Sequence, residues 1–151
     1  MAHLSFEGAE GARLGGKSFR IASVYSALSS ALLKWHKTAE AVAAVEMMRQ
    51  LTDDEWARVT VAVASAAAGD RTKAEAIIKE LDEMAARQFV SPCCYVFIYA
   101  ALGDKNQALD QLERAETDRD PYCLGFKCEP TFDEIHADPR FQAVLRKARF
   151  P

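Results

Sequence analysis

The segment whose residue types and spacing most suggest chemistry lies near the N-terminus. Gly11 is followed, after four residues, by Gly16-Lys17-Ser18. In phosphate-binding loops of this pattern, backbone N–H groups surround the phosphates, the lysine contacts them and the serine binds Mg²⁺. Such a loop follows a buried strand, and the only candidate before it is the short run His3-Leu4-Ser5-Phe6. We therefore favour a glycine-rich leader over residues 1–17 that matches the pattern by chance, with nucleotide binding at Gly11–Ser18 as the less favoured alternative.

The four cysteines give no metal-binding or disulfide pattern. Cys93 and Cys94 are adjacent, Cys123 and Cys128 are five residues apart, and no Cys-x-x-Cys pair exists. The three histidines are scattered, so no local signature supports a zinc site or a catalytic Cys–His pair. We predict no metal and no cofactor, and we interpret the cysteines as reduced, small apolar residues of a cytoplasmic protein.

Asp70 and Asp104 are carboxylates that acid–base chemistry would use. Each directly follows a glycine, at an expected turn between two helices. Aspartate is a preferred N-cap residue because its side chain accepts a hydrogen bond from the first helical turn. With these residues explained as caps, no catalytic constellation remains, and we predict that the chain is not an enzyme.

Composition narrows the class of protein. The chain has 151 residues, enough for one domain with a real core, and a net charge of −3, which gives no basic field for nucleic acid. It contains no run of about 20 apolar residues that would span a membrane. Between Lys17 and Ser91 there is a single glycine and no proline. A β-rich fold needs more turn residues, so the sequence predicts an all-α protein.

Apolar periodicity and helix-capping residues predict the elements of this all-α fold. Thr52 and Glu55 have capping-box spacing at one helix start, and Ser91 precedes Pro92 at another. The expected helices cover residues 18–33, 38–51, 53–68, 71–87, 92–102, 105–118 and 139–149.

A repeat of fixed period organises these helices. Gly69 and Gly103 are separated by one period, as are Asp70 and Asp104. Ala74 and Ala108 match at the same offset, and so do Ile78 and Leu112. Helix–turn–helix units that repeat roughly every 34 residues resemble the tetratricopeptide repeat, in which each hairpin covers the apolar face of its neighbour. We expect a single domain over residues 18–151, with clear repeats at 53–87 and 91–118 and a degenerate first hairpin at 18–51.

The C-terminal third carries a more particular resemblance. The motifs ALGDK, RDP, PTFDEI and DPRF, which lie between residues 100 and 141, resemble the closing segment of bacterial signalling and regulatory tetratricopeptide proteins. This resemblance implies that residues 121–149 fold back as a helical cap on the last repeat. Phe132, Asp133, Ile135 and Asp138-Pro139-Arg140-Phe141 would form that cap.

The same resemblance implies a concave groove, formed by the first helix of each repeat, that binds a peptide. The set of groove residues expected from the repeat register is apolar and aromatic, and it lacks the lysines and asparagines that clamp a terminal carboxylate. It consists of Trp56, Val59, Val63, Ala66, Val90, Cys93, Phe97 and Ala100. We therefore expect a protein or peptide partner, and neither nucleic acid nor a membrane.

Two alternatives stay open for these apolar residues. In the first alternative, Trp56 and Phe97 pack against the N-terminal helices or against a second copy of the chain, and not against a peptide. In the second, the chain self-associates through residues 18–51, where small residues accompany Tyr25 and Trp35, and serves as an accessory subunit of a bacterial signalling system. Only two repeats are clear, about the lower limit for independent stability, so self-association would help to cover apolar faces.

Overall fold

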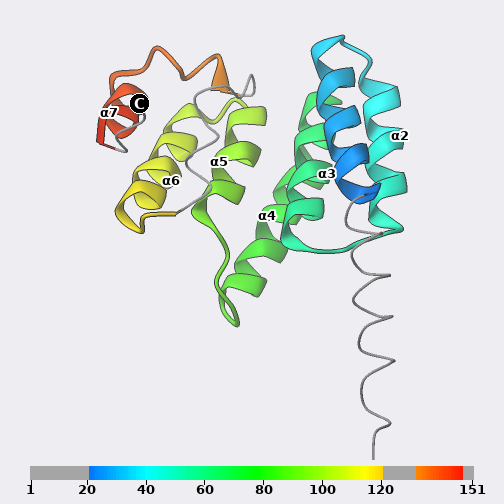
Figure 1. The fold of residues 1–151 in the computed structure, drawn as a ribbon, viewed down its shortest axis with the longest axis horizontal. Helices are drawn as coiled ribbons and strands as arrows, with labels where there is room; N and C mark the ends of the chain where they lie inside the picture. Colours follow the sequence, from blue (N-terminus) through cyan, green and yellow to red (C-terminus); the bar gives the residue numbers. More distant parts are fainter. Residues whose placement is uncertain (1–20, 121–131, 148–151) are drawn as a thin grey trace, which may run out of the picture.

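The structure is a computed structural model that describes residues 21–120 and 132–147. All regular elements within these two ranges are helices, and neither range contains a strand (Figure 1). The all-α prediction is thereby confirmed. The Gly11–Ser18 pattern, the leader over residues 1–17, Cys123 and Cys128 lie outside the described residues.

The helices follow the predicted order and agree with the predicted bounds to within about two residues wherever they are described. Residues 21–34 form the first helix, and the others are α2 (Thr38–Arg49), α3 (Glu55–Ala67), α4 (Arg71–Ala85), α5 (Pro92–Ala101), α6 (Lys105–Thr117) and α7 (Pro139–Lys147). Short turns join them into three successive hairpins and a closing helix. Figure 1 shows the hairpins side by side in chain order, from the first helix in blue to α7 in red.

The three hairpins turn in the same way. His36, Gly69 and Gly103 all have left-handed backbone conformations, with φ of 57°, 82° and 77°. In each turn the next residue donates its N–H to the carbonyl five residues back, at 2.9 Å, as in a Schellman C-cap. These positions follow the sequence repeat, except that the spacing from His36 to Gly69 is one residue shorter than the spacing from Gly69 to Gly103. The first hairpin is thus built like the other two, although its turn has no glycine.

A fully buried alanine accompanies each turn. Ala41, Ala74 and Ala108 lie five residues after the left-handed position, and each has an exposed fraction of 0%. A residue without a long side chain lets the two helices of a hairpin approach closely at this point. Turn and alanine keep the same separation in all three hairpins, so the residue by which the first spacing is shorter is missing between Ala41 and Gly69.

Helix starts depart from two predictions. The cap of α3 is Asp54, not Thr52, because the Asp54 carboxylate accepts from the Ala57 N–H at 2.8 Å and also from the Thr52 hydroxyl at 2.9 Å. The N-cap of α3 is therefore a carboxylate that lies two residues later in the chain than the predicted threonine. Asp104 occupies the N-cap position of α6 but makes no side-chain cap hydrogen bond. Its carboxylate instead accepts from Arg71 at 2.6 Å, which ties the second hairpin to the third.

Two helix N-caps agree with the sequence prediction. Asp70 accepts from the Lys73 N–H at 3.0 Å at the start of α4. Ser91 accepts from the Cys93 N–H at 3.1 Å at the start of α5, with Pro92 at the first helical position. Both side chains satisfy N–H groups that have no partner within the helix.

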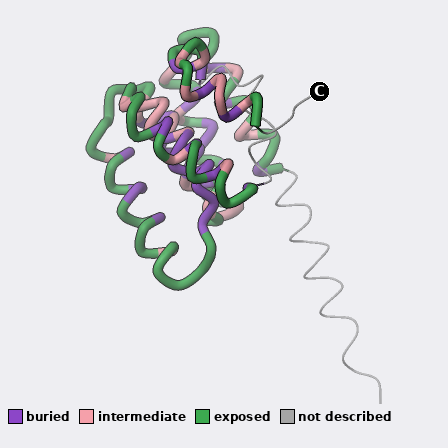
Figure 2. The backbone as a smooth tube through the Cα atoms, turned by 90° about the vertical axis from the view of Figure 1, so that its left-hand side faces the viewer, coloured by how far each residue is buried: buried purple, intermediate pink, exposed green. Residues whose placement is uncertain are grey.

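α5 lies between two apolar cores. Cys94, Tyr95 and Ile98 pack into the first core, which α3 and α4 dominate. Cys93 and Val96 pack into the second core with α6 and α7. Burial on both sides explains why α5 is apolar throughout, while the helices at the surface in Figure 2 alternate between buried and exposed residues.

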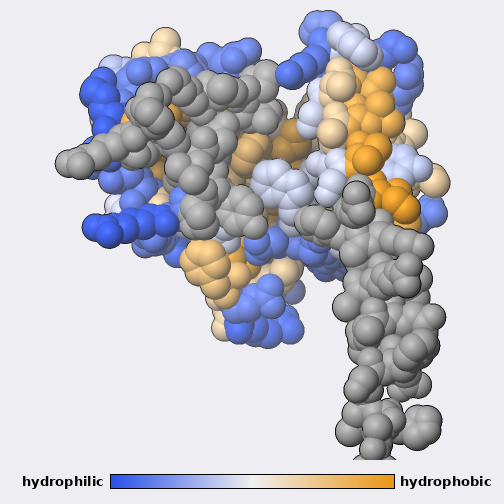
Figure 3. All heavy atoms as spheres, viewed as in Figure 1, coloured by the Kyte–Doolittle hydropathy of each residue, from blue (hydrophilic) through white to orange (hydrophobic). Residues whose placement is uncertain are grey.

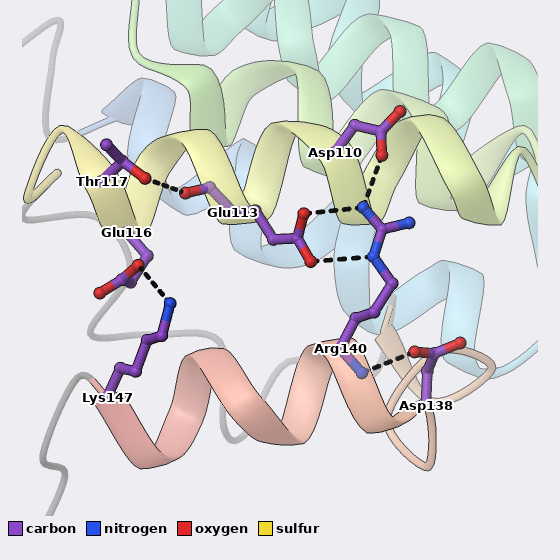
Figure 4. Close-up of polar contacts among 7 residues, drawn as sticks. All are labelled: Asp110, Glu113, Glu116, Thr117, Asp138, Arg140 and Lys147. Carbon is purple, nitrogen blue, oxygen red and sulfur yellow. Dashed lines mark hydrogen bonds and ion pairs between the residues drawn. The ribbon is translucent and has the colours of Figure 1, made fainter.

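The C-terminal cap closes the second core. Phe132, Ile135, Phe141 and Val144 are buried there against α5 and α6. Asp138 accepts from the Arg140 N–H at 2.8 Å and so caps α7, while Arg140 and Lys147 form ion pairs with α6 (Figure 4). α7 thus buries Phe141 and Val144 on one side and forms ion pairs at its edge, as the end of a helical stack requires.

Candidate binding groove

Two adjoining hollows lie between the first helix and α3. The larger one, of about 400 Å³, is lined by Ala22, Ser23, Ser26, Ala27, Met48, Thr52, Asp54, Trp56 and Ala57. The smaller one, of about 60 Å³, is lined by Ser26, Ser29, Ser30, Leu33, Trp56, Val59, Thr60, Val63 and Phe97. Trp56 and Ser26 border both hollows, so the two form one groove along the first helix and α3.

A hydrogen bond fixes the two walls of this groove. Thr60 in α3 donates its hydroxyl to the Trp56 carbonyl at 3.0 Å, so the Ser26 hydroxyl is the donor in its 3.3 Å contact with Thr60. Ser26 and Thr60 lie in the first helices of two successive hairpins and are 34 residues apart in the sequence. These two hydrogen bonds connect the first helix to the turn of α3 that carries Trp56.

Aromatic rings extend from the groove into the C-terminal core. The rings of Trp56 and Phe97 meet edge to face, with their centroids 5.2 Å apart. Phe97 in turn contacts Phe132 at 4.8 Å, and Phe132 lies 6.2 Å from Phe141. Edge-to-face geometry is a favourable arrangement for such pairs. Trp56 keeps 39% of its surface exposed, at the open end of this series.

The structure brings together half of the predicted groove residues. Trp56, Val59, Val63 and Phe97 line the smaller hollow, although Val59 is 2% exposed and contributes only part of its wall. Ala66 and Ala100 are partly buried and line neither hollow.

The placement of Val90 and Cys93 in an open groove was wrong. Val90 is buried in the first core, and Cys93 is fully buried in the second core beside Phe132. The C-terminal cap covers the face of α5 that the repeat register had assigned to the groove. The groove is therefore formed over the first helix and α3 and reaches α5 only at Phe97.

Sequence reasoning missed the contribution of the first helix. Ser26, Ser29, Ser30 and Leu33 supply one wall of the smaller hollow. The signal that could have found them was the repeat itself, because moving back by one period from Thr60 and Val63 leads to Ser26 and Ser29. The prediction applied the repeat register to α3 and α5 and did not extend it to the first helix.

The described lining of the groove carries very little charge. Asp54 is the one charged side chain among the described residues that line the two hollows, and it is engaged as the cap of α3. The adjacent Glu55 has a raised pKa, first because of burial and then because Asp54 and Asp120 are near. The lining otherwise offers apolar surface and hydroxyl groups. Such a lining supports contact with apolar side chains and hydrogen bonds to a neutral backbone.

The thiol closest to these acids is not activated. Burial raises the pKa of Cys94 to about 12, and the negative charges of Glu55 and Asp120 act in the same direction. A reactive cysteine requires a lowered pKa and access to solvent, and Cys94 has neither. This agrees with the interpretation of Cys93 and Cys94 as apolar core residues.

The part of the chain that the structure describes shows neither a metal centre nor a membrane span. No group of three His, Cys, Asp or Glu side chains gathers there in a way that would hold a metal ion. None of the helices described is both long and apolar enough to cross a bilayer.

Comparison with known proteins adds no relative. No family model, no curated protein and no solved structure matches the chain.

Proposed function

We propose that this chain is a non-catalytic module that binds a protein or peptide in the groove between the first helix and α3. The observation that carries the proposal is Trp56, which is 39% exposed, borders both hollows and is supported from behind by Phe97. Tryptophan is strongly enriched among the residues that dominate binding energy at interfaces. A ring held edge to face against another aromatic loses little further freedom when a partner binds.

The proposed architecture is that of a short tetratricopeptide-like superhelix. It is supported by three turns of one conformation at nearly equal spacings, each followed by a buried alanine. It is also supported by the contacts of α3 with α5, which are the first helices of consecutive hairpins. In such a stack the first helices form the concave side, and the groove lies on them.

The groove favours a neutral, apolar ligand segment. Its described lining residues include no lysine or arginine, so a terminal carboxylate gains no ion pair from them. Ser26 and Ser30 place hydroxyl groups along one wall, where they can bond to backbone groups of a bound segment. We propose that one bulky apolar side chain of the partner enters the larger hollow and packs against Trp56.

The cellular setting follows from the sequence resemblance. We propose a cytoplasmic adaptor, or an accessory subunit, of a bacterial signalling system. The recognition of the partner would then be the whole activity of this chain.

A peptide selection tests the groove directly. A display library of random dodecapeptides is selected on the full chain, and enriched peptides are titrated into a Trp35→Phe variant. The sequence has two tryptophans, so Trp56 is then the only tryptophan reporter. We expect the enriched peptides to shift the emission of Trp56 and to lose at least tenfold in affinity for Trp56→Ser.

The matched control is Phe89→Ser. Phe89 is 70% exposed and lines neither hollow, so its replacement removes an exposed aromatic side chain without touching the groove. Peptides that bind Trp56→Ser as tightly as the original chain, or that lose affinity only with Phe89→Ser, would overturn the assignment of the groove.

A further inference from the structure

The first helix exposes a second apolar surface. Ile21, Val24, Leu28 and Trp35 have exposed fractions of 49%, 65%, 43% and 70%. Spacings of three, four and seven residues place these side chains on one side of the helix. We call this surface the first-helix stripe. Figure 3 shows an apolar band along this helix, at the right of the molecule.

The stripe is separate from the groove. Successive residues of a helix are rotated by about 100°, so Ser26 and Ser30 of the groove wall lie on the side opposite to Val24 and Leu28. Between these two sides, Leu32 packs with the buried alanines of α2. Groove, core contact and stripe thus occupy three sides of one helix.

The chemistry of the stripe points to an uncharged partner. No charged residue occurs between Ile21 and Leu33. A small side chain, Ala31, lies between Leu28 and Trp35 on this side of the helix, so a partner helix can approach closely there. An acidic or basic partner would find no complementary charge along these residues.

We propose that the first-helix stripe is the interface of a homodimer, in which the first helices of two copies pack along each other about a two-fold axis. A second copy brings a stripe of the same length, spacing and neutrality, and in an isologous interface each contact occurs twice. The two-fold axis therefore doubles the apolar area that the four exposed side chains remove from water.

The expected dimer is weak. One helix of this length buries less than the ~800 Å² per partner of a standard stable interface. We therefore expect association in the micromolar range, with the two grooves facing away from the interface and free to bind. The dimer thus presents two copies of the binding surface at once.

Sedimentation velocity of the full chain tests the proposal between about 1 and 200 µM. We expect a concentration-dependent shift from 16.7 kDa toward twice this mass. Leu28→Glu places a charge in the centre of the stripe and should weaken association at least tenfold. The matched control is Ser30→Glu, which places the same charge on the groove side of the same helix and should leave association unchanged.

A second variant, Val24→Glu, keeps the test decisive if Leu28→Glu alters the helix content measured by circular dichroism, since Val24 is the more exposed of the two. A chain that stays monomeric at 200 µM overturns the proposal. So does equal association of Leu28→Glu, Val24→Glu and the original chain. A monomer that cosediments with vesicles of neutral and anionic phospholipid would instead assign the stripe to a lipid surface.

Discussion

Arg140 of α7 holds both carboxylate oxygens of Glu113 of α6. Its Nε lies 2.9 Å from Oε1 and its Nη2 lies 2.8 Å from Oε2, and Nη2 also reaches Asp110 at 2.5 Å (Figure 4). Bidentate pairs of this kind fix direction as well as distance. The neighbouring Phe141 is fully buried in the second core, so the ion pair orients α7 where its aromatic ring enters that core.

Arg140→Ala should lower the stability of the cap by about 1 kcal/mol, because the pair is partly exposed and solvent screens it. The hydrogen bonds of Arg140 lower the pKa of Glu113 in the folded chain. Their stabilising effect is therefore present above the unfolded pKa of Glu113, about 4.3, and is lost as pH falls through the lowered folded value. Urea unfolding at pH 7 and at pH 3 measures the difference.

Lys105→Ala is the control for this prediction. Within the described ranges the Lys105 side chain forms a single exposed ion pair, with Glu134 at 3.4 Å, so its loss should change stability by less than about 0.5 kcal/mol. An equal loss for Arg140→Ala at both pH values would show that the arginine acts through its aliphatic stem and not through Glu113.

The hairpins could be predicted from the sequence because their signals are local. Gly69-Asp70 and Gly103-Asp104 mark turns that need a left-handed residue, and the structure has one at each glycine. The turn at His36 uses the same conformation without a glycine, so the sequence located it only as the gap between the expected helices 18–33 and 38–51.

The groove was harder to predict because it depends on what covers each helix. Cys93 and Phe97 are four residues apart and share a face of α5, yet Cys93 is fully buried and Phe97 lines a hollow. The two residues differ in burial because Phe132 and the rest of the cap pack on one part of this face of α5. No periodicity within α5 carries that information, since it is a contact between segments distant in sequence.

Substitutions at two of the left-handed turn positions should change the stability of the chain in opposite directions. Gly69→Ala should cost about 1 kcal/mol from backbone strain alone, because an added Cβ meets no atom within 4 Å. His36→Gly should lose no stability and should gain up to about 0.5 kcal/mol, since strain at φ 57° is relieved while the unfolded chain gains freedom. Urea unfolding of both variants checks this, and a loss of about 1 kcal/mol for His36→Gly would mean that the imidazole stabilises the turn.

The stability of the chain should be sensitive to the size of the side chain at the buried alanine positions. Ala41→Leu and Ala108→Leu should each destabilise the chain by about 1–3 kcal/mol, because both positions are fully buried where two helices meet. Ala43→Leu, on the exposed side of α2, should stay within about 0.5 kcal/mol. Thermal unfolding measures the three variants, with about 2–4 °C expected per kcal/mol in a chain of this size. If Ala41→Leu is tolerated as well as Ala43→Leu, the first hairpin is not packed like the third.

The Cys94 thiol should resist alkylation in the folded chain. Burial, followed by the charges of Glu55 and Asp120, raises its pKa to about 12, whereas an ordinary thiol has a pKa of about 8.5. At pH 8 the reactive thiolate is then far rarer than in a free cysteine, and the thiol is also shielded from solvent. Labelling with iodoacetamide, read residue by residue by mass spectrometry, should modify Cys94 only once urea unfolds the chain. The control is the same chain labelled in urea, where Cys94 should react like a free thiol. Labelling of folded Cys94 at the free-thiol rate would mean that α5 opens toward solvent on the side of the first core.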